Sequence, residues 1–209
     1  MNLYISMKKI INLIKLLLGK YELSKYNNYT ISEYFRKQGA QIGEDCHLGI
    51  RQLASEPYLI KIGDKVGIAD GTLLLTHTSG WNFREIQPDL SDFGTIEIKN
   101  NCYIGANVII LPNVIIGENS LIAAGAIVTR DIPPNSVSAG IPAKVIGNID
   151  DFYLKIRSNW EKIKPPGYMI EIKAGSSFTR RKINQISQLP HNKKILREHL
   201  TKHFWGKSR

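Results

Sequence analysis

Residues 98–128 carry the pattern that decides the fold, and they read IKNNCYIGANVIILPNVIIGENSLIAAGAIV. An aliphatic residue stands at every sixth position, and the spacing continues one step further to a proline: Ile98, Ile104, Ile110, Ile116, Ile122, Val128 and Pro134. Four residues after each of these stands a second compact residue: Cys102, Val108, Val114, Ser120, Ala126, Ile132 and Ser138. A period of six matches neither a 3.6-residue helix nor the alternation of a strand, whereas a parallel β-helix with short sides and tight corners produces it.

The same spacing extends upstream to about residue 42, with two irregularities. Its upstream members are Ile42, Leu48, Ile62, Ile68 and Leu74, and Val66, Thr72 and Thr78 follow the last three at four residues. Leu48 and Ile62 lie fourteen residues apart, two more than two hexads, which predicts a small bulge around residues 52–58. Residues 80–97 do not fit the pattern, so we expect them to form a loop extruded from the coil.

Charge divides the chain into three parts. Residues 1–41 hold seven basic and two acidic side chains, residues 42–149 hold seven and eleven, and residues 150–209 hold fourteen and five. We expect these parts to be an N-terminal helical segment, a β-helix domain and a basic C-terminal helical extension. Because no motif that reads nucleic acid accompanies the basic residues, we expect no nucleic-acid partner. Besides a solvated helical face, basic termini suit a cofactor's phosphates or peripheral contact with a membrane surface.

A helix is expected near the N-terminus, over residues 9–19, with Gly19 at its end. Its apolar face would pack on the first coil or on a neighbouring subunit, and a membrane-surface anchor is the alternative. The apolar run is about half of the ~20 residues that a membrane span requires, and Lys15 interrupts it. No small residues suited to signal cleavage follow it, so a secretory signal is not expected.

Two more helices are expected in the C-terminal extension, over residues 150–163 and 193–204. His199 and His203 share one face of the second helix, and we interpret them as surface residues because no third metal ligand accompanies them. The only cysteines, Cys46 and Cys102, both occupy the compact inward position of the repeat. They are therefore expected to fill the core rather than form a disulfide, which fits a cytoplasmic protein.

His77 is the histidine that combines a place in the regular repeat with a place at the mouth of the extruded loop. A sugar hydroxyl is too weak an acid to ionise near neutral pH, so its attack on a thioester needs a base that takes the proton. An imidazole titrates in the suitable range. The alternative is an ordinary histidine at a corner of the coil, and the loop that departs directly after it favours the catalytic interpretation.

Three stretches, together with the hexads, give residues 42–146 a resemblance to a known family. They are EPYLIKIGD at 56–64, TRDIPP at 129–134 and GIPAK at 140–144, and they are similar to the hexapeptide-repeat acyltransferases, in the branch of sugar or polysaccharide O-acetyltransferases. The resemblance implies a mainly β fold, a left-handed parallel β-helix of about four to five coils flanked by helical extensions. It also implies assembly into a homotrimer.

The resemblance further implies an enzyme that moves an acetyl group from acetyl-CoA to a hydroxyl of a sugar or polysaccharide precursor, possessing no metal and using His77 as the general base. The residues that match the family's acetyl-CoA groove are Tyr103, Gly105, Ala106, Ala124, Thr129, Arg130 and Lys144. Small residues there would let the pantetheine arm lie against the coil, and the cationic ones would contact phosphates. In the loop, Trp81, Phe83 and Arg84 are candidates for an acceptor wall, since aromatic faces suit sugar rings.

One departure from the family concerns Thr78, which stands where the branch commonly has an acidic residue, and it leaves the partner that orients His77 unidentified. Two alternatives stay open: acetyl transfer to an amine, as on an amino sugar, and a non-catalytic β-helix scaffold. A metal-dependent β-helix enzyme would need three histidine ligands, whereas residues 42–149 contain only His47 and His77.

Overall fold

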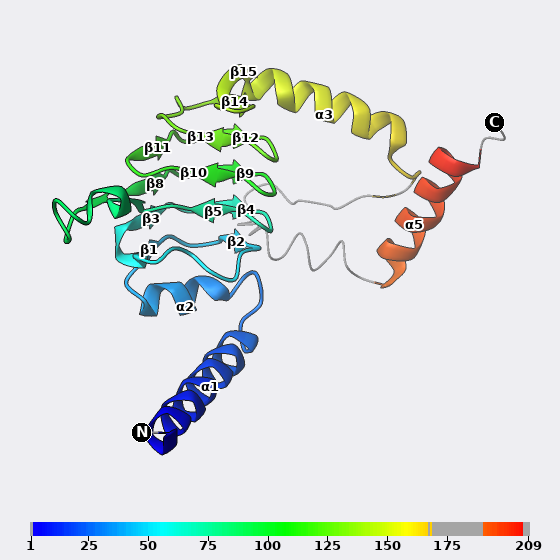
Figure 1. The fold of residues 1–209 in the computed structure, drawn as a ribbon. Helices are drawn as coiled ribbons and strands as arrows, with labels where there is room; N and C mark the ends of the chain where they lie inside the picture. The colour runs from blue at the N-terminus through cyan, green and yellow to red at the C-terminus, as the bar shows by residue number, and fades with distance from the viewer. Residues whose placement is uncertain (1, 167, 169–189, 207–209) are drawn as a thin grey trace.

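The molecule is a three-sided prism of stacked coils with helices at both ends (Figure 1). The structure is a computed structural model, and it describes residues 2–166, 168 and 190–206. Within these ranges, no helix combines the length and the apolar character needed to cross a membrane. Three parallel sheets form the sides of the prism, as expected for a left-handed β-helix.

Each sheet collects one side from successive coils. The first sheet contains β1 (Gln41–Ile42), β3 (Ile60–Ile62), β8 (Ile96–Ile98) and β11 (Val114–Ile116). The second contains β2 (His47–Leu48), β4 (Gly67–Ile68), β9 (Tyr103–Ile104), β12 (Leu121–Ile122) and β14 (Ser136–Ala139), to which β15 (Lys144–Asn148) is added antiparallel. The third contains β5 (Leu73–Leu74), β10 (Ile109–Ile110) and β13 (Ile127–Val128).

The hexads place their aliphatic residues along the axis of the prism. Ile98 pairs with Ile116, eighteen residues later, so one coil takes three hexads. The side chains from Ile98 to Val128 at this position are all fully buried, and the compact residues four positions later are buried too. Burial of this axial stack stabilises the prism, and each coil contributes through contacts with its neighbours. The prediction of a β-helix of four to five coils is confirmed.

The glycine that follows an isoleucine in the hexads is explained by the distance between coils. A Cβ at Gly105 would lie 2.5 Å from the backbone nitrogen of Ala124, and one at Gly117 would lie 2.4 Å from that of Pro134. At these corners the backbone of the next coil leaves no room for a side chain.

The last coil departs from the predicted spacing. Ile132, and not Pro134, is buried beside Ile116, with which it forms an isolated parallel bridge. Ser138 accordingly pairs with Ile122 in the same inward row, sixteen residues apart instead of eighteen. The assignment of Pro134 to the seventh hexad was therefore wrong, because the turn at residues 129–131 is two residues shorter.

The first coil contains the expected bulge. Ile42 pairs with Ile62, twenty residues later, and the extra residues include a short 3₁₀ turn, η1 (Pro57–Leu59). The extruded segment is an antiparallel hairpin of β6 (His77–Ser79) and β7 (Ser91–Phe93), with the 3₁₀ turn η2 (Trp81–Phe83) near its tip. The predicted boundaries, 80–97, need correction, because Ile96–Ile98 already forms β8 in the wall of the coil. Thr78, expected to face inward, lies exposed in the hairpin.

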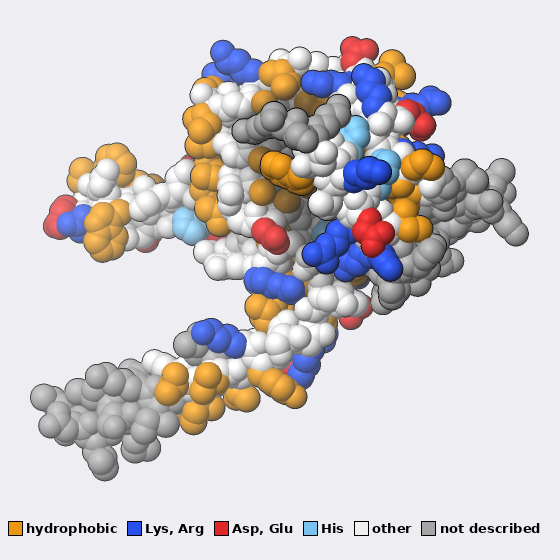
Figure 2. All heavy atoms as spheres, turned by 90° about the vertical axis from the view of Figure 1, so that its right-hand side faces the viewer, with side chains coloured by type: hydrophobic (Ala, Val, Ile, Leu, Met, Phe, Trp, Pro, Cys, Tyr) orange, Lys and Arg blue, Asp and Glu red, His pale blue; other side chains and the backbone are white. Residues whose placement is uncertain are grey.

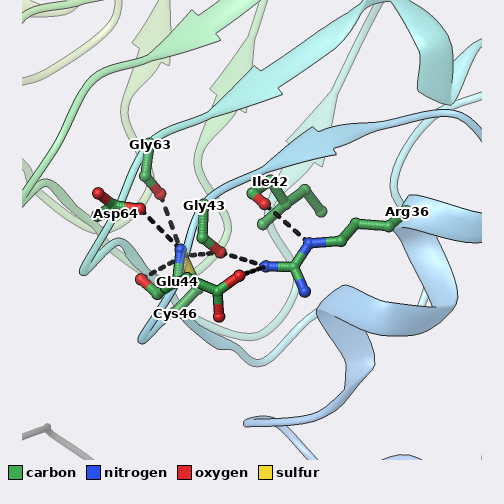
Figure 3. Close-up of polar contacts among 7 residues, drawn as sticks. All are labelled: Arg36, Ile42, Gly43, Glu44, Cys46, Gly63 and Asp64. Carbon is green, nitrogen blue, oxygen red and sulfur yellow. Dashed lines mark hydrogen bonds and ion pairs between the residues drawn. The ribbon is translucent and has the colours of Figure 1, made fainter.

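The N-terminal segment forms two helices, and the predicted helix end at Gly19 was wrong. α1 spans Asn2–Ser24 and continues through Gly19. A Cβ at Gly19 would meet no atom within 4 Å. The cover on the first coil is α2 (Ile31–Lys37), whose Ile31 and Phe35 are fully buried. The Arg36 guanidinium fixes this cover by donating to the carbonyl oxygens of Ile42 (2.8 Å) and Gly43 (2.6 Å) and to Glu44 (2.9 Å; Figure 3).

Among the described residues after the prism there are two helices, as predicted. α3 (Ile149–Ile163) begins at Asn148, whose side chain accepts a hydrogen bond from the backbone of Asp151 (2.8 Å). The helix starts beside the last coil and runs outward from it (Figure 1). α5 spans Pro190–Trp205. Residues 169–189, for which no structure was predicted, lie outside the described residues.

Candidate active site

His77 is the residue at which the hairpin leaves the wall of the prism. Thr76 is buried, and its carbonyl oxygen accepts a hydrogen bond from the backbone of Gly94 (2.8 Å), where the chain re-enters the coil. His77 opens the hairpin and pairs with Phe93, whose ring centroid lies 5.8 Å from the imidazole. Its side chain is 44% exposed. The position combines a fixed backbone with access to a ligand.

Glu56, from the bulge of the first coil, holds the imidazole. Its Oε2 lies 2.9 Å from Nδ1 of His77 and accepts a second hydrogen bond from the Thr76 hydroxyl (2.5 Å). The carboxylate can only accept, so Nδ1 carries the hydrogen and Nε2 keeps a lone pair. Hydrogen bonds from Thr76 and then His77 lower the pKa of Glu56 below its usual value. Glu56 thus remains ionised, which favours this tautomer.

Sequence analysis missed Glu56 as the partner of His77. The length of the first coil could have indicated it. This coil contains twenty residues, so residue 56 stacks next to residue 76 of the following coil. Thr78, which replaces the expected acidic residue, donates to Asp92 across the hairpin (3.0 Å). This contact links the two strands of the hairpin. The imidazole of His77 instead donates its hydrogen bond to Glu56.

The predicted acceptor-wall residues lie together near the tip of the hairpin. Trp81, Phe83 and Arg84 are exposed, and the Arg84 guanidinium stacks over the Trp81 ring at 4.7 Å from its centroid. Arg84 also donates to the carbonyl oxygen of Trp81 (3.0 Å). These contacts give the tip an ordered aromatic and cationic surface.

The predicted donor residues divide between two edges of the third sheet. At the edge before its strands, the corners of the third and fourth coils stack, with Gly125 donating to the carbonyl oxygen of Ala106 (2.8 Å). Ala124 belongs to this corner and is exposed, and Lys144 begins β15 nearby, since Ala143 donates to the carbonyl oxygen of Ile127 (2.8 Å). Tyr103, in β9, lies on the outer face of the second sheet leading to this edge and is 40% exposed.

The other edge of the third sheet carries the remaining donor residues. Thr129 and Arg130 follow β13 and are exposed, on the side where His77 leaves the coil. One chain therefore brings together the small residues of the groove but keeps the third sheet between them and Arg130. The two groups of predicted donor residues therefore line different edges of the third sheet, and each edge could border a separate groove.

The hollow next to His77 is small. It has a volume of about 160 Å³ and is lined by residues 52–55 and 73–77. Cavities that enclose a small-molecule ligand usually measure ~300 to 1,000 Å³. Leu73 and Leu75 are exposed beside the histidine on the outer face of the third sheet. A single chain thus offers a small hollow beside His77 and an exposed apolar surface next to it.

Other candidate groups form no second reactive centre among residues 2–166, 168 and 190–206. In these ranges no three His, Cys, Asp or Glu side chains come together as a metal site would require. The rings of His199 and His203 stack at 6.3 Å on α5. Cys46 and Cys102 are buried and free, and burial raises the pKa of both thiols, so neither is an activated nucleophile.

Comparisons with known proteins agree with this class of β-helix. The family model "Bacterial transferase hexapeptide (six repeats)" matches residues 95–130. Protein CapG of Staphylococcus aureus is 44% identical over 137 residues, covering 64% of this chain and 80% of CapG. Galactoside O-acetyltransferase of Escherichia coli K12 is 43% identical over 112 residues, covering 53% of this chain and 54% of that enzyme. This chain therefore spans about half the length of the latter relative.

Two solved structures share the fold. The maltose O-acetyltransferase of Clostridium difficile 630 superposes with a TM-score of 0.51 at 25% identity, covering 63% of this chain and 84% of that one. The hexapeptide-repeat acetyltransferase VCA0836 of Vibrio cholerae superposes with a TM-score of 0.52 at 23% identity over 63% and 86% of the two chains. This chain belongs to the hexapeptide-repeat acetyltransferase family, which confirms the resemblance, and its enzyme class is acetyltransferase.

Proposed function

We propose that this protein is an acetyl-CoA-dependent O-acetyltransferase that acts on a hydroxyl of a sugar or polysaccharide precursor. The observation that carries the proposal is the pair of His77 and Glu56 at the mouth of the hairpin, with Nδ1 and Oε2 2.9 Å apart. The names of the relatives support the acceptor class, because they include a galactoside and a maltose O-acetyltransferase.

The mechanism is direct transfer with His77 as general base. Nε2 takes the proton of the acceptor hydroxyl while its oxygen attacks the thioester carbonyl carbon. Glu56 stabilises the imidazolium that forms, because its carboxylate already accepts from Nδ1. A backbone amide of the groove would hold the tetrahedral oxyanion. The carbon–sulfur bond then breaks, and the departing thiolate receives the proton from the imidazolium, so the base is regenerated without a covalent intermediate.

Acetyl-CoA would lie along the corners of the later coils. The small side chains of Ala106 and Ala124 would leave room for the pantetheine arm beside Tyr103 and the tight corner at Gly105. Thr129, Arg130 and Lys144 would contact the distal phosphates. No metal takes part in this scheme. Trp81, Phe83 and Arg84 at the hairpin tip would form the wall against which the acceptor sugar lies.

A homotrimer would complete the site. The donor residues occupy both edges of the third sheet, so prisms packed side by side would bring the small residues of one chain opposite Arg130 and His77 of the next. The same packing would cover Leu73 and Leu75. Free buried cysteines and the use of acetyl-CoA suit a cytoplasmic location, with the inner face of the membrane as one site of action.

The test begins with acetyl-CoA alone, because it requires no choice of acceptor. Titration calorimetry on the purified protein should show saturable binding of one acetyl-CoA per chain. Release of CoA thiol is then measured colorimetrically with galactosides, maltose and other neutral sugars, in parallel with amino sugars. O-acetyl products would support the proposal, N-acetyl products would favour the amine alternative, and a folded protein that binds no acetyl-CoA would leave the scaffold alternative.

A further inference from the structure

α1 carries an apolar face that no other described part of the chain covers. The helix runs away from the base of the prism and joins it only near its C-terminal end, where Leu23 and Tyr26 pack on the core (Figure 1). Six large apolar side chains along it are 48–64% exposed: Ile11, Leu13, Ile14, Leu17, Leu18 and Tyr21. Their spacing of three and four residues places them on one side of the helix.

The net charge of α1 is positive. Its sequence has lysines at positions 8, 9, 15 and 20, with Lys25 directly after the helix, and Glu22 is its only acidic residue. Glu22 is already paired with Lys25 (2.5 Å). Figure 2 shows apolar side chains gathered along one edge of the described part of α1 and a basic side chain on the opposite edge. An apolar face beside an uncompensated basic one is the pattern of a helix that lies in a lipid headgroup region.

The same charges argue against a second copy of α1 as the occupant of this face. Helices that associate through a narrow apolar seam usually flank it with charges of opposite sign. Two or three copies of α1 would instead bring lysines next to lysines, because each copy has only one acidic residue to offer. An anionic lipid surface complements both features of the helix, since it accepts apolar side chains and attracts lysines.

We propose that α1 docks this protein on anionic membranes, with the face made by Ile11, Leu13, Ile14, Leu17, Leu18 and Tyr21 buried among the lipid headgroups. The helix is about 35 Å long at 1.5 Å per residue, so it would lie in the plane of the surface and hold the prism beside it. This inference is independent of the acetyl-transfer chemistry, because it uses no residue of the active site.

The experiment is co-sedimentation of the full-length protein with vesicles of phosphatidylglycerol and phosphatidylcholine. We expect the wild-type protein to bind the mixed vesicles, to bind pure phosphatidylcholine vesicles weakly, and to be released as salt rises from about 0.1 M to about 0.5 M. The double variant Leu13→Ser, Leu17→Ser should lower the partition coefficient about tenfold or more, since both side chains lose their apolar burial. Lys20→Glu should weaken binding several-fold at low salt only.

Matched controls come from helices of the same chain. Leu154→Ser with Ile156→Ser removes two equally exposed aliphatic side chains from α3, and Lys193→Glu with Lys194→Glu changes the charge of α5. Both should leave vesicle binding unchanged. All variants are checked for an unchanged melting temperature and for acetyl-CoA binding, which separates this test from that of the proposed function.

Three outcomes would overturn the proposal. The first is a wild-type protein that stays in the supernatant with anionic vesicles. The second is binding that the α5 variant abolishes and the α1 variants keep, which would assign it to the C-terminal extension. The third is a change of oligomeric state in Leu13→Ser, Leu17→Ser without lipid, measured by analytical ultracentrifugation, which would make this face a contact between copies of the chain.

Discussion

Nδ1 of His77 and Oε2 of Glu56 lie 2.9 Å apart, although the two residues are separated by one full coil of the prism. Glu56 reaches this position because the first coil contains twenty residues, two more than the regular coil from Ile98 to Ile116. The bulge thus places an acidic group under the base that the hairpin presents. The contact replaces the acidic neighbour that Thr78 does not supply.

Replacing His77 by alanine should lower kcat by about 10²- to 10⁴-fold, since the proton of the acceptor then has no base to take it. The dissociation constant for acetyl-CoA, measured by calorimetry, should stay within about twofold of wild type. Equal losses of binding and turnover would instead assign His77 to the donor groove.

Replacing Glu56 by glutamine should lower kcat roughly tenfold or more but less than His77→Ala does, because the amide cannot stabilise the imidazolium electrostatically. The KM for acetyl-CoA should change little, because Glu56 does not reach the predicted groove. Glu118→Gln, on an exposed corner of the fourth coil, is the matched control and should retain wild-type turnover. Unchanged turnover in Glu56→Gln would remove the positioning role.

The lowered pKa of Glu56 has a consequence for stability. Because the folded-state pKa lies below the unfolded value of 4.5, the contribution of Glu56 is complete above about pH 5.5 and is lost as pH falls through the folded pKa. The difference in melting temperature between wild type and Glu56→Gln should therefore be constant from about pH 5.5 to 7 and shrink below about pH 4.5. A difference that grows at low pH would contradict the assignment.

Replacing Ala124 by tryptophan should weaken acetyl-CoA binding about tenfold or more, because the side chain would fill the space reserved for the pantetheine arm. Ala124 is exposed, so the melting temperature should stay near that of wild type. Lys144→Glu should weaken binding as well, through repulsion of the phosphates, and raising the salt concentration should reduce its effect. Lys155→Glu on α3 serves as its charge-matched control.

Replacing Arg36 by methionine should lower the free energy of unfolding by about 2 kcal/mol, because two carbonyl oxygens of the first coil lose a charged donor while the aliphatic stem remains. Urea titration followed by circular dichroism would measure the change. Lys155→Met on α3 removes a positive charge from an exposed helix and should change stability by less than about 0.5 kcal/mol.

The β-helix could be predicted from the sequence because each hexad repeats the same requirement, an inward aliphatic side chain at a tight corner of the coil. Ile104 and Ile122 face the same axis, and Gly105 and Gly117 stand where the next coil passes too close for a Cβ. Single-copy features were less readable. The shortened last turn moved Ile132 and Ser138 from the compact position into the row of Ile116 and Ile122, and a single step of six residues could not reveal the shift.

Contacts across coils explain what the sequence analysis missed in the site. His77 was identified from its own neighbours in the chain, but its partner depends on the length of an irregular coil. The end of α1 was placed too early because glycine commonly ends helices. Here the helix continues past Gly19, and its apolar spacing extends through Tyr21 to Leu23. Nothing in the hexads indicated that α2 would cover the first coil instead.

Covers at both ends determine how this prism can grow. A stack of parallel coils offers unpaired backbone groups at each end, and bare ends could add further chains without limit, as amyloid fibres do. Here α2 and the Arg36 guanidinium occupy one end, while β15 closes the other with a strand of reversed direction. Copies of the protein are thereby directed to associate through their flanks, where a finite ring can form, rather than end to end into filaments.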